Sequence, residues 1–169
     1  MTPNTNSGPA SAGPLFDALA TATRALCAAI LVALVSLVCL EALLRGGFNY
    51  SLGFAEELTG YGVVMMTFFG AALSLRAGTL FQVHFLLDRC PERTNRWLVR
   101  GFALVALFIC IVLAWKTKDL MLSSLARGKF APTVLRTPLW IPQMVLPLGF
   151  GVIAVFVTEK FLLTFKEAR

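Results

Sequence analysis

The stretch ALCAAILVALVSLVCLEALL (residues 25–44) decides the fold, because its 20 residues are apolar or small and Glu41 is its only charged residue. Three further stretches have the same character and carry no charged residue, namely residues 58–75, 101–115 and 137–158. A hydrocarbon core about 30 Å thick is crossed by roughly 20 helical residues. The sequence therefore predicts an all-α integral membrane protein with four transmembrane helices.

The predicted transmembrane domain covers residues 18–165, with spans at about residues 22–44, 57–76, 98–122 and 138–160. The third apolar stretch is short, but Lys116 and Lys118 can extend their stems and place their ammonium groups at the interface, so the helix can continue beyond them. Residues 1–17 are rich in Pro, Gly, Ser, Thr and Asn and are predicted to be a disordered tail. Residues 166–169 form a short C-terminal tail. The first apolar run is long enough to stay as an anchor, so we expect no cleaved signal peptide.

The segment between the second and third spans is expected to form an additional interfacial helix at about residues 79–90. At helical spacing its apolar residues form one stripe, and Pro91 ends the pattern. The chain's single histidine, His84, lies on this segment. A lone histidine here is more often a surface or packing residue than a metal ligand or proton carrier.

The distribution of basic residues predicts the orientation of the chain, since Lys and Arg in short loops stay on the cytoplasmic side. With the N-terminus inside, nine Lys and Arg residues lie on the inner side and six on the outer side. Both termini are therefore predicted to be cytoplasmic.

Composition and motifs exclude several classes of function. A chain of 169 residues with 57% apolar content leaves no room for a soluble catalytic domain. The four cysteines show no Cys-x-x-Cys spacing and there is one histidine, so no metal or cofactor site is expected. The net charge of +6 is dispersed beside the spans, which suits membrane topology better than nucleic acid. Glu41 is taken as the only acidic residue within a span, so the chain lacks the deep ionisable residues of a pump.

These absences favour a non-enzymatic accessory subunit of a larger membrane complex. A self-contained small exporter or channel that acts as a homo-oligomer remains the alternative. That alternative needs polar residues along one face of each span, and the spans carry only isolated ones such as Ser36, Thr67 and Gln143. The two hypotheses differ in the partner they require, because one needs a larger subunit and the other only copies of itself.

Two motifs resemble a known family. The run EELTGYGVVMMTFFGAALSLRAG (residues 56–78) resembles the second helix of the small membrane subunit, the Q or DctQ-like subunit, of TRAP (tripartite ATP-independent periplasmic) transporters. The run TPLWIPQMVLPLGF (residues 137–150) resembles the fourth helix of that subunit. After the Arg-x-Gly exit of the second helix, the chain departs from the family's usual His-Ile pair, with Leu80 and Phe81 at the matching positions.

The resemblance implies a non-catalytic subunit of the bacterial inner membrane. Its implied partners are a large multi-span membrane subunit, a periplasmic substrate-binding protein and membrane lipids. The family takes up carboxylate substrates by secondary active transport, driven by an ion gradient that is usually sodium. By analogy this chain would brace the large subunit. The candidate contact residues lie near the ends of the second helix and in the fourth: Glu56, Glu57, Arg76, Trp140 and Gln143.

Overall fold

The computed structural model describes residues 13–78, 92–133 and 135–166. It contains four helices, α1 (Pro14–Phe48), α2 (Ala55–Ala77), α4 (Glu92–Ala126) and α5 (Trp140–Lys166). All four are long and apolar enough to cross a membrane, which confirms the predicted all-α membrane protein with four transmembrane helices. The expected interfacial helix at residues 79–90 lies outside the described residues.

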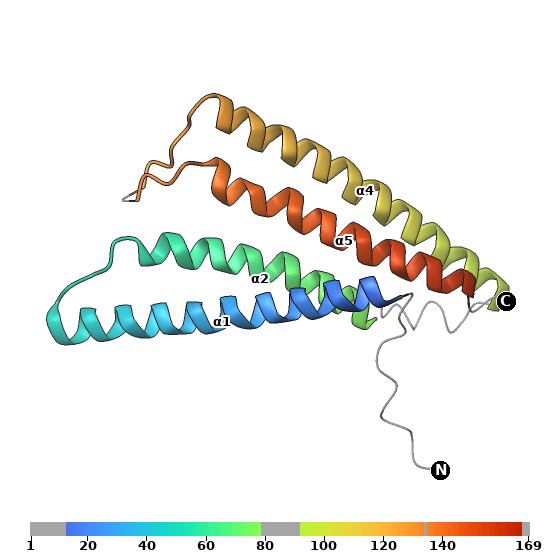
Figure 1. The fold of residues 1–169 in the computed structure, drawn as a ribbon, viewed down its shortest axis with the longest axis horizontal. Coiled ribbons are helices and arrows are strands. Elements are labelled where there is room, and N and C mark those ends of the chain that lie inside the picture. Colours follow the sequence, from blue (N-terminus) through green and yellow to red (C-terminus); the bar gives the residue numbers. More distant parts are fainter. Residues whose placement is uncertain (1–12, 79–91, 134, 167–169) are drawn as a thin grey trace, which may run out of the picture.

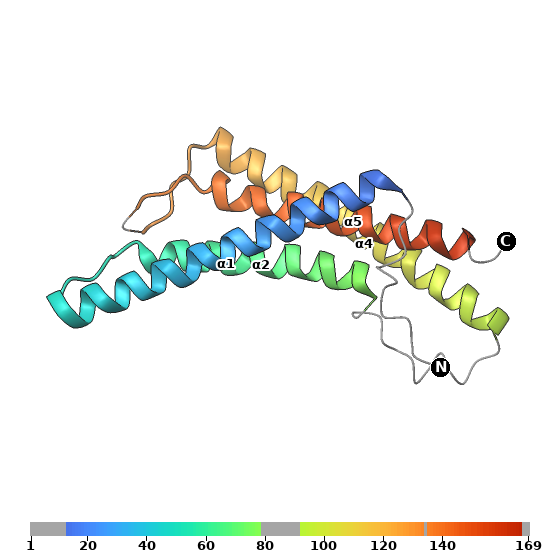
Figure 2. The same ribbon diagram turned by 60° about the horizontal axis from the view of Figure 1, so that its bottom comes forward.

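The helices form two antiparallel hairpins that pack side by side. In Figure 1 the row runs α1, α2, α5, α4, so α2 and α5 make the contact between the α1–α2 hairpin and the α4–α5 hairpin. Figure 2 shows that the start of α1 also leans over α5. We call the end where α1 and α4 begin the termini end. The opposite end, with the connections at residues 49–54 and 127–139, is the loop end.

Local chemistry explains where the helices begin and end. Pro14 opens α1, where its missing N–H has no intrahelical partner to lose. Asn49, at a left-handed φ of 51°, closes α1 by donating its N–H to the carbonyl of Leu44. Gly78, at φ 82°, closes α2 in the same way by donating to the carbonyls of Ser74 and Leu75.

Helix α1 is longer than the predicted span at both of its ends. It includes Asp17, which was assigned to the tail, and residues 45–48, which lie beyond the predicted end of the span at residue 44. The physical reason is cooperativity, because extending an existing helix adds a hydrogen bond for each residue without a new nucleation step. The glycines at 46 and 47 weaken this extension without stopping it.

A small core at the termini end joins three of the helices. Ala20, Ala72, Leu75, Phe156 and Val157 are buried together there, and side chains of α4 pack against them. Two glycines allow close approach of helices elsewhere in the bundle. A Cβ at Gly62 would lie 2.5 Å from Cδ2 of Leu34, and one at Gly149 would lie 2.6 Å from Cγ of Phe68. The backbones of α2 and α5 can therefore approach closely at Gly149, as is common in membrane helix packing.

Helix α5 continues through Pro147 without interruption. The outward faces of α1 and α4 expose many large apolar side chains, among them Val32, Leu43, Phe108 and Trp115. A soluble protein would rarely tolerate so much exposed apolar surface. In a bilayer the same faces can meet lipid.

Candidate functional site

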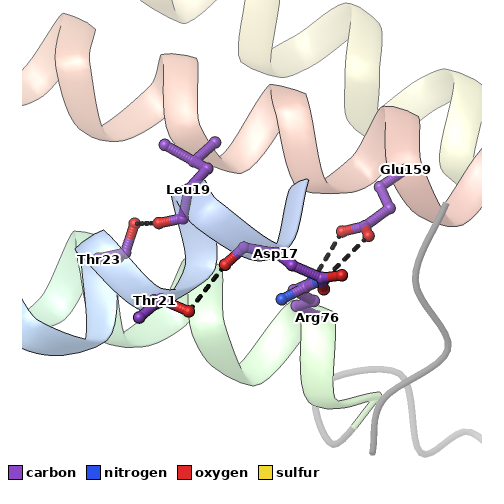
Figure 3. Close-up of polar contacts among 6 residues, drawn as sticks. All are labelled: Asp17, Leu19, Thr21, Thr23, Arg76 and Glu159. Atoms are coloured by element: carbon purple, nitrogen blue, oxygen red, sulfur yellow. Dashed lines mark hydrogen bonds and ion pairs between the residues drawn. The ribbon is translucent and has the colours of Figure 1, made fainter. Parts of the chain in front are cut away.

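Three charged side chains from three helices meet at the termini end, and we call them the termini-end cluster (Asp17, Arg76 and Glu159). The Arg76 guanidinium donates to both carboxylate oxygens of Glu159, from Nε at 2.9 Å and from Nη2 at 3.2 Å. Nη2 also donates to Oδ1 of Asp17. Figure 3 shows the guanidinium of Arg76, from α2, between the carboxylates of α1 and α5. One cation thus connects both hairpins.

The members of this cluster differ strongly in burial. The Glu159 side chain is 1% exposed and that of Arg76 is 8% exposed, whereas that of Asp17 is 54% exposed. The Arg76 guanidinium carbon also lies 5.7 Å from the centroid of the buried Phe156 ring. A buried carboxylate is tolerated only when it is paired and hydrogen-bonded, so Glu159 depends on Arg76 for its charge.

Threonines near the start of α1 keep their hydroxyl groups within the helix. The Thr21 hydroxyl donates to the carbonyl of Asp17 at 2.9 Å, and the Thr23 hydroxyl donates to the carbonyl of Leu19 at 2.8 Å (Figure 3). These bonds satisfy the hydroxyl groups locally. Neither hydroxyl is therefore needed by the termini-end cluster.

A second polar group lies at the loop end, and we call it the loop-end cluster (Glu57 and Tyr61). The Tyr61 hydroxyl donates to Oε1 of Glu57 at 2.6 Å, one helical turn away on α2. The other carboxylate oxygen, Oε2, is buried and has no hydrogen-bond partner among the described residues. The loop around Thr137 lies close to this carboxylate.

The loop at residues 127–139 is itself ordered by backbone hydrogen bonds. The Ala131 N–H donates to the Thr137 carbonyl at 2.9 Å, and the Leu139 N–H donates to the Lys129 carbonyl at 2.9 Å. Phe130 and Pro138 face each other in an antiparallel bridge. The loop therefore holds the end of α4 beside the start of α5.

The five predicted contact residues have different surroundings in the structure. Arg76 and Glu57 belong to the two clusters, at opposite ends of α2. Glu56 is exposed, and Trp140 is half-buried at the start of α5. The amide oxygen of Gln143 is buried and has no hydrogen-bond partner within residues 13–78, 92–133 and 135–166. Contact of these five residues with a partner subunit stays a prediction.

Two members of the termini-end cluster, Asp17 and Glu159, are not among the contact residues predicted from the sequence. Glu159 lies within Trp140–Thr164, the part of α5 that is long and apolar enough to cross a membrane, so Glu41 is not the only acidic residue in such a helix. The interpretation from the sequence ended the last apolar stretch at Thr158, although apolar residues resume at Phe161. The usable signal was the isolated acidic residue between two apolar runs, because such a residue requires a partner in the membrane.

The described residues offer no metal-binding arrangement. Within them, no three His, Cys, Asp or Glu side chains come together in a way that could hold an ion. The chemistry of the two clusters is instead that of hydrogen bonding and ion pairing between helices. The site found here is therefore suited to holding helices in place.

Comparison with known families decides the identity of the chain. Residues 34–167 match the model of the DctQ component of tripartite ATP-independent periplasmic transporters. The chain belongs to the DctQ family. Together with its four membrane-spanning helices, this makes it a small, multi-pass inner-membrane subunit of a TRAP transporter.

Two curated relatives are similar to this DctQ chain. One is the "Isethionate TRAP transporter permease protein DctMQ" of Oleidesulfovibrio alaskensis, 24% identical over 102 residues, which are 59% of this chain and 16% of the relative. The other is the "Putative TRAP transporter small permease protein" of Haemophilus influenzae, 27% identical over 108 residues, which are 62% of this chain and 67% of the relative. The chain thus spans only a small part of the longer DctMQ protein.

Proposed function

We propose that this chain braces a large multi-span membrane subunit during ion-gradient-driven uptake of a carboxylate, delivered by a periplasmic binding protein. The coupling ion is proposed to be sodium. The observation that carries the proposal is the family match over residues 34–167. The name of the DctMQ relative, a permease protein that combines M and Q, supports an association with a large subunit.

The structure supports a bracing role through the position of its charges. The ion pairs of the termini-end cluster connect α1, α2 and α5 to one another, which fixes the helices in place. Buried charges that are already paired within the chain are poorly suited to pick up and release an ion. The exposed apolar faces of α1 and α4 supply a large surface for lipid or for a partner's helices.

Co-purification tests the proposed partnership. The affinity-tagged full chain is expressed with the large subunit of its own transporter, extracted in mild detergent and analysed by size-exclusion chromatography. A one-to-one complex is expected. Recovery of homo-oligomers alone would instead favour the small exporter or channel.

Reconstitution tests the proposed transport role. Proteoliposomes receive this chain alone, the large subunit alone or both, with the binding protein and a labelled substrate outside and an inward sodium gradient. Uptake is expected only with both subunits. Because isethionate is a sulfonate, the assay includes a sulfonate beside carboxylates. Accumulation by this chain alone would overturn the bracing role.

The proposed contact residues are Glu56, Glu57, Arg76, Trp140 and Gln143. Among them Gln143 is half-buried on α5, so part of its polar side chain is open to another subunit. A photo-crosslinking amino acid at 143 is expected to capture the large subunit. The same amino acid at Leu148, which is exposed on α5, serves as the comparison.

Both termini are proposed to lie in the cytoplasm, because the inner side then carries nine of the Lys and Arg residues counted against six outside. Fusions of alkaline phosphatase and of green fluorescent protein to the C-terminus test this. Fluorescence without phosphatase activity is expected, and the reverse pattern would contradict the orientation.

A further inference from the structure

Helices α2 and α5 provide reference heights for the membrane. On α2, Glu57 and Arg76 bracket the apolar stretch and are 19 residues apart, which is about 28 Å of helix. Arg76 pairs with Glu159, and Phe68 stacks edge-on against Phe150 with 4.9 Å between ring centroids. These contacts align the two helices, which run in the same direction, so Glu57 lies near the height of Trp140.

Helix α1 is displaced toward the loop end relative to these references. Asp17 pairs with Arg76, and Leu34 lies against Gly62 in the antiparallel neighbour. In this register Arg24 lies about five residues closer to the loop end than Arg76. The charged residue at the other end of the α1 apolar stretch, Arg45, lies about seven residues beyond Glu57. Both ends are therefore shifted by roughly 8–10 Å in the same direction.

Helix α4 is displaced in the opposite direction. Arg100 donates to the carbonyl of Thr164 at 3.2 Å, five residues beyond Glu159 toward the termini end. Lys116 lies ten residues before the end of α4 at Ala126, which places it near the height of Leu148 in α5. The apolar stretch of α4 is thus shifted by roughly 8–12 Å toward the termini end. Figure 1 shows the same stagger, with α1 extending furthest at the loop end and α4 furthest at the termini end.

We infer that the bundle is tilted in the lipid bilayer. Both membrane surfaces cross α1 nearer the loop end and cross α4 nearer the termini end. From α1 to α4 the charged boundary moves by about 16–22 Å along the helices, whereas three helix spacings of about 8–10 Å separate the outer axes. The helices are therefore tilted by roughly 30–40° from the bilayer normal, at the upper end of the range for transmembrane helices. Lipid headgroups meet Lys116 at one edge and Arg24 at the other.

An upright bundle would place charges in hydrocarbon. Lys116 and Lys118 would then lie about eight and six residues below Trp140, or roughly 12 and 9 Å, on a face of α4 that is exposed. Lys118 instead has the surroundings of an interfacial residue, since its Nζ lies 4.9 Å from the centroid of the exposed Trp115 ring and 3.9 Å from Oδ1 of Asp119. This inference concerns the bilayer alone and does not depend on the proposed transport role.

Single cysteines of matched height test the inclination. The full chain, with its native cysteines replaced by alanine, is placed in its own membrane with its transporter partners. One pair compares K116C with L148C at one surface, and the other compares R24C with I111C at the opposite surface. All four native side chains are exposed, and within each pair the two residues share a height along the bundle. Labelling uses a membrane-impermeant maleimide in spheroplasts and in inside-out vesicles.

We expect K116C and R24C to react at least about tenfold faster than their matched partners, because a thiolate forms in water and not in hydrocarbon. The two fast positions react from opposite sides of the membrane. Equal rates within either pair would overturn the inclination, because an upright bundle or a polar partner surface over α4 gives both residues the same access to water.

Native Trp115 gives a readout that needs no cysteine changes. In the W97F/W140F chain, lipids brominated near the headgroup are expected to quench Trp115 more strongly than lipids brominated near the chain ends. Stronger quenching from the chain ends would place Trp115 deep in the bilayer and contradict the inference.

Discussion

The two ends of the bundle connect their helices in different ways. At the termini end, Arg76 is ion-paired to Asp17 of its own hairpin and to Glu159 of the other hairpin. At the loop end, the Tyr61–Glu57 and Ser51–Glu41 hydrogen bonds both stay within the α1–α2 hairpin. Among the described residues, ion pairs join the two hairpins at the termini end alone.

The bundle therefore resists separation of its two hairpins mainly at the termini end. The buried core of Ala20, Ala72, Leu75, Phe156 and Val157 lies at the same end as the ion pairs. The proposed bracing role needs a part that keeps its shape, and the ion pairs and the buried core both lie at the termini end. The loop end has a hydrogen-bonded loop and weaker side-chain contacts, so its helices can adapt to a partner more easily.

The largest expected effect comes from removing the cation of the termini-end cluster. Arg76→Ala removes the cation that is ion-paired to the 1%-exposed Glu159, and loss of one member of a buried pair costs about 3–5 kcal/mol. Unfolding of the purified chain in mixed micelles, followed by circular dichroism, measures the change. Arg24→Ala removes an exposed arginine from α1 and serves as the control. Equal stability of the two variants would show that the ion pairs do not hold the hairpins together.

A second test moves to the contact between α2 and α5. Gly149→Ala places a Cβ 2.6 Å from Cγ of Phe68. This atom joins the ring to its Cβ, so it cannot move aside as the flexible end of a long side chain could. Overpacking of this kind costs about 1–3 kcal/mol, and the same unfolding measurement detects it.

Gly151→Ala is the matched control, because a Cβ there meets nothing within 4 Å. Both substitutions add one methyl group to the same helix, so helix propensity cancels in the comparison. If Gly151→Ala is as damaging as Gly149→Ala, close approach at Phe68 is not what limits the packing of the two hairpins.

Much of this architecture was predictable from the sequence. Runs of apolar residues bounded by charges are a direct consequence of membrane thickness, so the number and approximate position of the helices followed from them. The two motifs at residues 56–78 and 137–150 indicated the family that the match over residues 34–167 then showed. These are local properties of the chain.

The termini-end cluster could not be predicted, because it depends on which helices are neighbours. Asp17 and Arg76 are 59 residues apart in the chain, and Arg76 and Glu159 are 83 apart. Hydropathy does not specify the order α1, α2, α5, α4 across the row. Arg76 was predicted as a contact with a partner subunit, whereas its pairing with Asp17 and Glu159 within the chain follows from the helix order.

A smaller loss of stability is expected from a substitution in the loop-end cluster. Tyr61→Phe removes the hydroxyl that donates to Glu57, and a hydrogen bond of this kind contributes about 0.5–1.5 kcal/mol. Tyr50→Phe, at an exposed position, is the control in the same unfolding assay. A loss of stability as large as that caused by Arg76→Ala would mean that the two ends of the bundle contribute equally to its stability.

The smallest effect is expected for Asp17→Asn. This change removes the charge of a side chain that is 54% exposed, and exposed ion pairs contribute about 0–1 kcal/mol. Arg76 keeps its bond to Glu159 in the variant, so the contact between the hairpins is retained. Glu159→Gln is the informative counterpart, since it removes the charge of the buried partner. If Asp17→Asn proves as costly as Glu159→Gln, the anchoring of α1 rather than the contact between hairpins is the main contribution of Arg76.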